Sequence, residues 1–351
     1  MKTKSRILTS IHEEIKIQAG YLDNESISSI YFGGGTPSIL ESKEIEKIIA
    51  TLTNHHNIKS DVEITLECNP DDLNQKKLEA LYDIGINRLS IGIQSFRDKD
   101  LTLMNRAHHA QEAKTSVHLT KKTGFKNLTI DLIYGVPEMS LADWKANLQE
   151  AIQLDVPHIS SYCLTIEKGT AFNHFVEQKR ITPVTDDLAS EQYQTMVELL
   201  NQAGYEHYEV SNFAKPGFIS RHNSSYWQNK KYLGIGPSAH SYNGISRQWN
   251  VASNTKYYKT IEAGKPFFEK ETLSLHTRYN EYLLTGLRTK WGIDLDYINN
   301  NFSINFLTAN SKLIAQLLEN KDVTIEDHIF RLTEKGLLRA DGISSDFFVV
   351  E

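Results

Sequence analysis

The chain has 351 residues and a mass of 40.0 kDa, enough for one large α/β barrel with an appendage or for two medium domains. Hydrophobic residues make up 40% and charged residues 23%, and the formal net charge of −6 argues against binding to nucleic acid or anionic membranes through a basic surface. No apolar run is long enough to span a bilayer, and Cys68 and Cys163 are too few for a disulfide framework, so we expect a cytoplasmic protein.

Short β-branched runs alternate with helical windows along the first half of the chain. The helical windows carry apolar stripes, such as Ile45, Ile48 and Leu52, and end near glycines. This alternation predicts a parallel sheet covered by helices, and polar residues at the ends of the strands favour a partial (β/α)6-type barrel over a doubly wound sheet. The predicted strands are residues 27–32, 62–67, 88–94, 127–134 and 158–164.

The pattern changes in the second half of the chain. Residues 205–250 are rich in aromatic residues and glycine, and we predict that they add strands to the barrel. Beyond them, helical periods precede residues 331–350, which we interpret as the helix, turn and hairpin of a winged-helix-like domain. Residues 251–351 contain 12 basic and 14 acidic residues, so a charge of −2 argues against DNA binding. We therefore predict two domains, residues 1–250 and 251–351.

Three consecutive glycines follow the first predicted strand. In YFGGGTPS, Gly34, Gly35 and Thr36 lie between that strand and a helix whose N-cap we expect to be Ser38. Glycine leaves backbone amides open to a ligand, so this turn is a candidate binding loop. A tight turn without a ligand is the simpler alternative, and no Walker sequence follows.

The next three strands also end in polar residues. We expect Glu67, Gln94 and Asp131 at their carboxyl ends, with Arg106 twelve residues beyond Gln94 and an N-cap at Asp71. Each one alone is more often a structural polar residue than a ligand contact. Together with the glycine turn they predict one pocket for a small, zwitterionic, hydroxylated molecule, because a barrel gathers its strand ends at one mouth and arginine binds carboxylates bidentately.

A further candidate lies in HNSSYW, residues 222–227. His222 could ligate haem iron, and the rings of Tyr226 and Trp227 could cover a porphyrin. A hydrogen-bonded structural histidine is the alternative.

The order of these motifs closely resembles that of radical SAM proteins in the oxygen-independent coproporphyrinogen III oxidase-like group. Within the group the chain is most similar to the HemW-type haem chaperones, because HNxxYW is typical of them. The resemblance covers about residues 10–350. It rests on YFGGGTPS, ITLECNPDD, GINRLSIGIQSF, NRAH, IDLIYGVP, SSYCLTIEKGTAF, YEVSNFAKPG, HNSSYW and LGIGPSAHSY.

The resemblance implies three ligands: S-adenosylmethionine, a [4Fe-4S] cluster and haem. It implies that haem contacts His222, Tyr226 and Trp227 and passes to an acceptor protein, with respiratory enzymes as candidates. The positions that would hold S-adenosylmethionine are Gly34, Gly35, Thr36, Glu67, Gln94, Arg106 and Asp131.

One family feature is missing from this sequence. Family members begin with a strand and a CxxxCxxC loop that supplies three thiolates to the cluster, whereas this chain begins at the following helix. Cys68 and Cys163 cannot replace that loop, so we expect no cluster in the chain as written and a barrel without its first strand. A truncated gene model or a late start codon would explain the difference.

Three functions are compatible with these features. The first is a haem-binding chaperone that transfers haem to an acceptor. The second is an oxygen-independent coproporphyrinogen III oxidase, which carries out radical oxidative decarboxylation in porphyrin biosynthesis. The third is a barrel that binds a nucleoside-like ligand without radical chemistry. The missing cysteines make catalysis by this chain doubtful, and HNSSYW favours the first function over the second.

Overall fold

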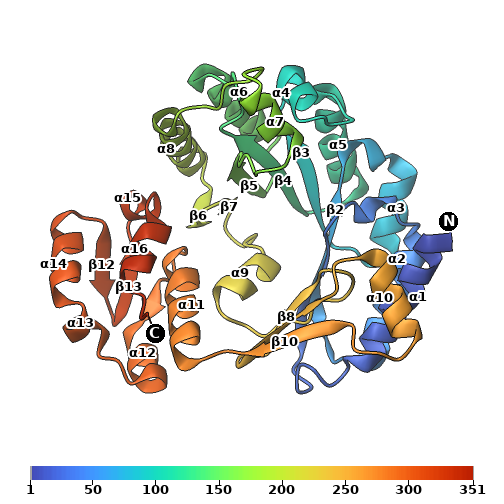
Figure 1. Cartoon of the computed structure of the whole chain (residues 1–351). Coiled ribbons are helices and arrows are strands. Elements are labelled where there is room, and N and C mark those ends of the chain that lie inside the picture. The colour runs from blue at the N-terminus through green and yellow to red at the C-terminus, as the bar shows by residue number, and fades with distance from the viewer. Residues whose placement is uncertain (1, 351) are drawn as a thin grey trace. The chain divides into compact units, whose positions relative to one another are not determined.

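The computed structural model describes residues 2–350 (Figure 1). The chain packs into two compact units. One contains the chain up to Ser29, Lys43–Val62 and the chain from Arg221 onwards; the other contains Ile30–Ser42 and Glu63–Ser220. This division follows packing, and the domain boundary near residue 250 stays a prediction. No helix among residues 2–350 combines the length and apolar character needed to cross a membrane.

A seven-stranded open sheet carries the first half of the fold, in the order β1-β2-β3-β4-β5-β7-β6. Strands β2 to β5 are parallel, and β7 pairs antiparallel with both β5 and β6. This confirms the predicted partial barrel. Of the strands expected within residues 205–250, only those at residues 206–214 join this sheet, and those at residues 240–250 belong to a second sheet. The strands are β1 (Ile27–Phe32), β2 (Ile58–Cys68), β3 (Arg88–Gln94), β4 (Asn127–Tyr134), β5 (His158–Cys163), β6 (Glu206–Glu209) and β7 (Asn212–Ala214).

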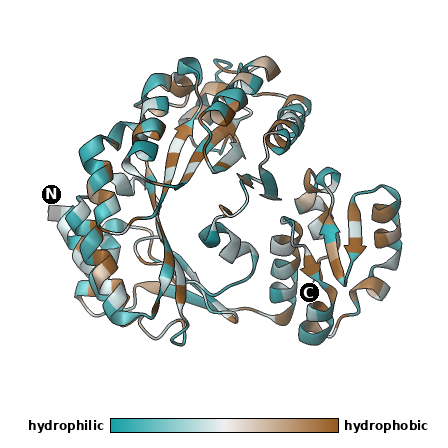
Figure 2. Ribbon diagram, turned by 180° about the vertical axis from the view of Figure 1, so that it is seen from behind, coloured by the Kyte–Doolittle hydropathy of each residue, from teal (hydrophilic) through white to brown (hydrophobic). Residues whose placement is uncertain are grey.

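Helices connect the strands as the apolar stripes predicted. In α6, Trp144 and Leu148 are fully buried, and Gly124 and Gly204 end helices with positive φ angles of 108° and 82°. Figure 2 shows apolar residues concentrated on the sheet strands and polar residues on the outer sides of the helices. The helices of this part are α2 (Ser42–His55), α3 (Gln75–Asp83), α4 (Asp98–Leu103), α5 (Ala110–Thr123), α6 (Leu141–Gln153), α7 (Ala171–Glu177) and α8 (Asp186–Gln202).

The unit that contains Arg221 onwards begins with α1 (Lys2–Ile17), which packs against α10 (Asn254–Glu262). The fully buried Glu14 of α1 accepts hydrogen bonds from the Gly236 amide at 2.8 Å, Asn250 Nδ2 at 2.6 Å and the Tyr257 hydroxyl at 2.5 Å. These bonds fix the loop before a second, three-stranded sheet. That sheet contains β8 (His240–Tyr242), β9 (Ser246–Asn250) and β10 (Phe268–Thr272), and α9 (Arg221–Trp227) precedes it.

The last part of the chain has the element order of a winged helix, but one element lies earlier than predicted. Its hairpin is residues 323–332, and residues 331–350 contain mainly helices. The turn residues Asp327 and His328 have φ angles of 48° and 64°, as a two-residue type I′ turn requires. The elements are α11 (Leu275–Leu287), β11 (Ile293–Asp294), α12 (Leu295–Phe302), α13 (Phe306–Ala309), α14 (Ser311–Glu319), β12 (Val323–Glu326), β13 (Ile329–Leu332), α15 (Glu334–Leu337) and α16 (Ala340–Asp346).

Candidate functional site

The glycine turn after β1 is built around one carboxylate. The Gly34 amide donates to Glu67 Oε2 at 3.1 Å, and the Tyr31 hydroxyl donates to Glu67 Oε1 at 2.7 Å. A Cβ on Gly33 would lie 2.8 Å from Glu67 Oε1 and 2.4 Å from the Tyr31 ring. Gly34 and Gly35 have φ angles of 78° and 91°, and space is open where their side chains would point. The turn therefore needs glycine both for its conformation and for the approach of Glu67.

Two helix starts near this turn differ from the prediction. Ser38 lies in a short 3-10 helix, Pro37–Ile39, with Thr36 at its N-cap position, and donates to Asp72 Oδ2; α2 starts only at Ser42. The predicted cap at Asp71 is also wrong, because Asn74 caps α3 by accepting from the Lys77 amide. Proline after Thr36 and after Asn69 starts a 3-10 turn at each place, so the regular helix begins a few residues later.

Asp131 does not end its strand, because β4 continues for three residues to Tyr134. The half-buried carboxylate of Asp131 accepts from the Ser90 hydroxyl at 3.2 and 3.3 Å. Burial, followed by the nearby charge of Glu67, raises the pKa of Asp131 to about 7. Asp131 and Glu67 therefore lie close enough that the charge of one disfavours ionisation of the other.

Gln94 and Arg106 meet at the end of β3. Gln94 is the last residue of the strand and has a φ angle of 68°, which is unusual for a residue other than glycine. Arg106 Nη2 donates to Asn69 Oδ1 at 2.9 Å and to the Gly92 carbonyl at 3.3 Å. A Cβ on Gly92 would lie 2.8 Å from Gln94 Nε2 and 3.4 Å from Arg106 Nη2. A glycine at this point thus lets both side chains lie against the strand.

These contacts gather the predicted residues at the carboxyl edge of the sheet. Glu67, the glycine turn and Asp131 form one group, and Gln94 and Arg106 form a second; Asn69, two residues after Glu67, reaches the second group. Three residues of these groups were not predicted from the sequence: Tyr31, Asn69 and Ser90. Ser90 joins the site through the register between β2 and β3, where it aligns with Glu67, and this pairing is visible only in the sheet.

The carboxyl edge can recognise a ligand that carries both charges. Its carboxylates can accept from an amine or from hydroxyl groups, while its guanidinium and amide can donate to a carboxylate. An iron–sulfur cluster does not fit the residues present. Cys68 is buried, its pKa is raised by that burial, and residues 2–350 contain no group of three His, Cys, Asp or Glu side chains placed to hold a metal.

The motif HNSSYW forms α9. The rings of His222 and Tyr226 meet edge to face with their centroids 5.0 Å apart, as the spacing of four residues requires in a helix. Nδ1 of His222 lies 3.3 Å from the Ser29 hydroxyl oxygen, which fixes the orientation of the ring. Tyr226 is 41% exposed, so its ring is available to a ligand. Trp227 lies at the next position, where its ring is 5.6 Å from the Arg288 guanidinium carbon.

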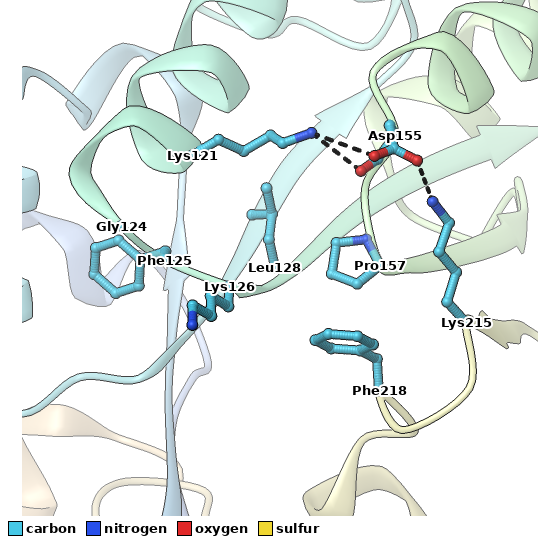
Figure 3. Close-up of a pocket in the computed structure, with 9 residues that line it drawn as sticks. All are labelled: Lys121, Gly124, Phe125, Lys126, Leu128, Asp155, Pro157, Lys215 and Phe218. Carbon is cyan, nitrogen blue, oxygen red and sulfur yellow. Dashed lines mark hydrogen bonds and ion pairs between the residues drawn. The ribbon is translucent and has the colours of Figure 1, made fainter.

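A cavity that the sequence analysis did not predict lies at the amino edge of the sheet (Figure 3). It has a volume of about 460 Å³ and lies before β4 and β5, opposite the carboxyl edge. Lys121 and Lys215 on its rim both pair with Asp155. Their charge is therefore partly neutralised, and the cavity is separate from the predicted site residues. It is lined by Lys121, Gly124, Phe125, Lys126, Leu128, Asp155, Pro157, Lys215 and Phe218.

Comparison with known proteins connects both parts of the chain to one group. Residues 6–151 match the family model of the radical SAM superfamily, and residues 273–339 match that of the HemN C-terminal domain. The heme chaperone HemW of Lactococcus lactis is 32% identical over 93% of this chain and 86% of its own length. HemW of Synechocystis is 34% identical over 84% of this chain and 71% of its own length.

Similarity extends to an animal protein and to a solved structure. The mitochondrial radical S-adenosyl methionine domain-containing protein 1 of Danio rerio is 30% identical over 90% of this chain and 74% of its own length. The structure of coproporphyrinogen III oxidase HemN from Escherichia coli matches with a TM-score of 0.84 and 22% identity, covering 99% of this chain and 83% of that one. At this identity the match supports the fold and not the activity.

Proposed function

The chain belongs to the HemW family of radical SAM proteins, and on that premise we propose that it binds haem and transfers it to an acceptor protein. The observation that carries the proposal is the arrangement of α9. A histidine and an exposed tyrosine lie there in ring contact, within the HNSSYW sequence. Imidazole is a common ligand of haem iron, and an exposed aromatic ring provides an apolar face for a porphyrin.

We further propose that the carboxyl edge of the sheet binds S-adenosylmethionine. Glu67 and Asp131 would face the amine and hydroxyl groups of this ligand, while Arg106 and Gln94 would face its carboxylate. The open space beside Gly34 and Gly35 supports this proposal. Because the residues present do not fit an iron–sulfur cluster, we assign no radical step to them.

The oxidase alternative has less support. It rests on the fold shared with the Escherichia coli enzyme, which is 22% identical to this chain. The curated relatives at 30% identity and above include several HemW chaperones.

Titration with ferric haem tests the proposal. The purified chain should give a Soret band that saturates, and His222→Ala should remove most of it, because the iron loses its imidazole ligand. His12→Ala is the matched control: this half-buried histidine of α1 bonds the Thr51 hydroxyl at 2.8 Å and is not in α9. Equal bands from both variants would mean that haem is held elsewhere, and the proposal would then be wrong.

A further inference from the structure

Helix α11 contacts α9, and side chains on one of its faces bond to Asn229 after α9 and to Arg247 of β9. Figure 1 shows α11 beside α9. Glu281 accepts from Arg247 Nη2 at 2.7 Å, and Thr285 Oγ1 accepts from Asn229 Nδ2 at 3.2 Å. The spacing of three, four and three residues places three side chains of α11 and that of its C-cap residue on this face. They are Arg278, Glu281, Thr285 and Arg288, the last of which lies over Trp227.

A row of aromatic rings begins at His222 and ends near the start of this helix face. The ring centroids of His222 and Tyr226 are 5.0 Å apart, those of Tyr226 and Tyr232 are 4.7 Å apart, and those of Tyr232 and Tyr242 are 6.2 Å apart. The backbones of Tyr232 and Tyr242 exchange two hydrogen bonds of 2.9 Å. We call Tyr226, Tyr232 and Tyr242 the aromatic row; it continues the α9 site onto β8.

Arg278 supplies a positive charge near Tyr242, the last residue of the aromatic row counted from His222. Its half-buried guanidinium has no hydrogen-bonded or ionic partner among residues 2–350. By contrast, Arg247 is paired with Glu281 and Arg288 is paired with Asp341. Burial and then the charge of Glu281 raise the pKa of Tyr242, and the charge of Arg278 acts in the opposite direction, so both side chains lie near this hydroxyl.

Haem has a shape and charge that match this arrangement. It is a flat apolar ring with iron at its centre and propionate carboxylates along one edge. A protein that holds it needs an imidazole for the iron, aromatic faces for the ring and a cation for a carboxylate. Arginine is suited to the last role, because its planar guanidinium donates two parallel hydrogen bonds to one carboxylate.

We propose that Arg278 binds a propionate of haem while the aromatic row contacts the porphyrin and His222 takes the iron. This inference rests on the proposed haem function and adds to it a residue for recognising the carboxylate. It also gives α11, which lies within the region matched by the HemN C-terminal domain, a part in ligand binding.

Two probes test this assignment: ferric haem and ferric haem dimethyl ester, whose propionates are blocked, both titrated in the same detergent. Arg278→Gln should weaken the binding of haem by about 10- to 100-fold, the usual effect of losing a hydrogen bond to a charged group. It should leave binding of the dimethyl ester unchanged. Arg278→Lys should recover part of the loss, because it keeps the charge but not the paired hydrogen bonds.

Arg180→Gln is the matched control, since Arg180 is exposed, also has no carboxylate partner among the described residues, and belongs to the other unit. It should change neither titration. Equal weakening of both probes by Arg278→Gln, or unchanged binding of haem, would overturn the assignment. A wild-type chain that binds the ester as tightly as haem would also overturn it. Failure of His222→Ala to lower the Soret band would instead contradict the iron ligand, so the two proposals fail separately.

Discussion

Replacing Asp131 by Asn should make the stability of the protein less dependent on pH. Burial and the nearby charge of Glu67 raise the pKa of Asp131 from 3.8 to about 7. The folded protein therefore holds this proton more tightly than the unfolded chain does. The free energy of unfolding should fall as the pH rises from about 4 to about 7, where Asp131 ionises in the folded state.

The expected size of the effect follows from the two pKa values. From about pH 5 to about pH 8, ionisation of Asp131 should cost roughly 2 to 3 kcal/mol of stability. The amide that replaces the carboxylate has no charge to gain, and its oxygen can still accept the hydrogen bond from Ser90. The variant should therefore gain that amount relative to the wild type as the pH rises.

Denaturation in urea at the two pH values measures the difference. Of the four tryptophans, Trp144 alone lies in the unit with Asp131, so a background with Trp227, Trp249 and Trp291 changed to Phe makes fluorescence report on that unit. Asp83→Asn is the control, because Asp83 is an exposed residue of α3 in the same unit. It should change the free energy of unfolding by the same amount at both pH values. If Asp131→Asn also changed the free energy of unfolding by the same amount at both pH values, the raised pKa of Asp131 would be refuted.

Two further substitutions test the surrounding contacts. Glu67→Gln removes a charge that raises the pKa of Asp131, so the pH at which stability falls should move lower in the same urea titration; an unmoved midpoint would contradict the closeness of the two carboxylates. Glu14→Ala leaves the Gly236 amide and the Tyr257 hydroxyl without their buried acceptor and should cost about 3 to 5 kcal/mol in urea denaturation. Glu13→Ala, which removes an exposed ion pair with Lys16, should cost less than about 1 kcal/mol, and similar losses in the two variants would contradict a special role of Glu14.

The ranges of β3 and β4 were predicted from the sequence because leucine and isoleucine recur along them and a glycine, Gly85 or Gly124, lies shortly before each. Strand β2 starts four residues before its predicted range, at Ile58, since its first part is polar and mostly exposed. The position of Asp131 was misjudged for a related reason: a polar residue within an apolar run resembles a strand end. The register with Ser90 and Ser160, which makes the interior position possible, is visible only in the sheet.

The hairpin of the C-terminal part shows a second limit of sequence reasoning. Its turn is Asp327-His328, without the glycine that usually accompanies positive φ angles, so the hairpin was predicted in residues 331–350, which contain mainly helices. The helix face with Arg278 could not be predicted at all. Its spacing is present in the sequence, but the contacts with Arg247 and Trp227 depend on tertiary packing.

The position of α11 links two equilibria. Its buried residues Tyr279, Leu283 and Leu287 belong to the core of the C-terminal part, where the helix packs against α16. Another face contacts α9 and bonds to Arg247 of β9. A ligand held between His222 and Arg278 would bind more tightly when α11 is in place than when it is unfolded. Occupancy of the aromatic row and unfolding of the C-terminal part would then be thermodynamically coupled, so that cargo loading stabilises a region of the chain that contains none of the iron's ligands.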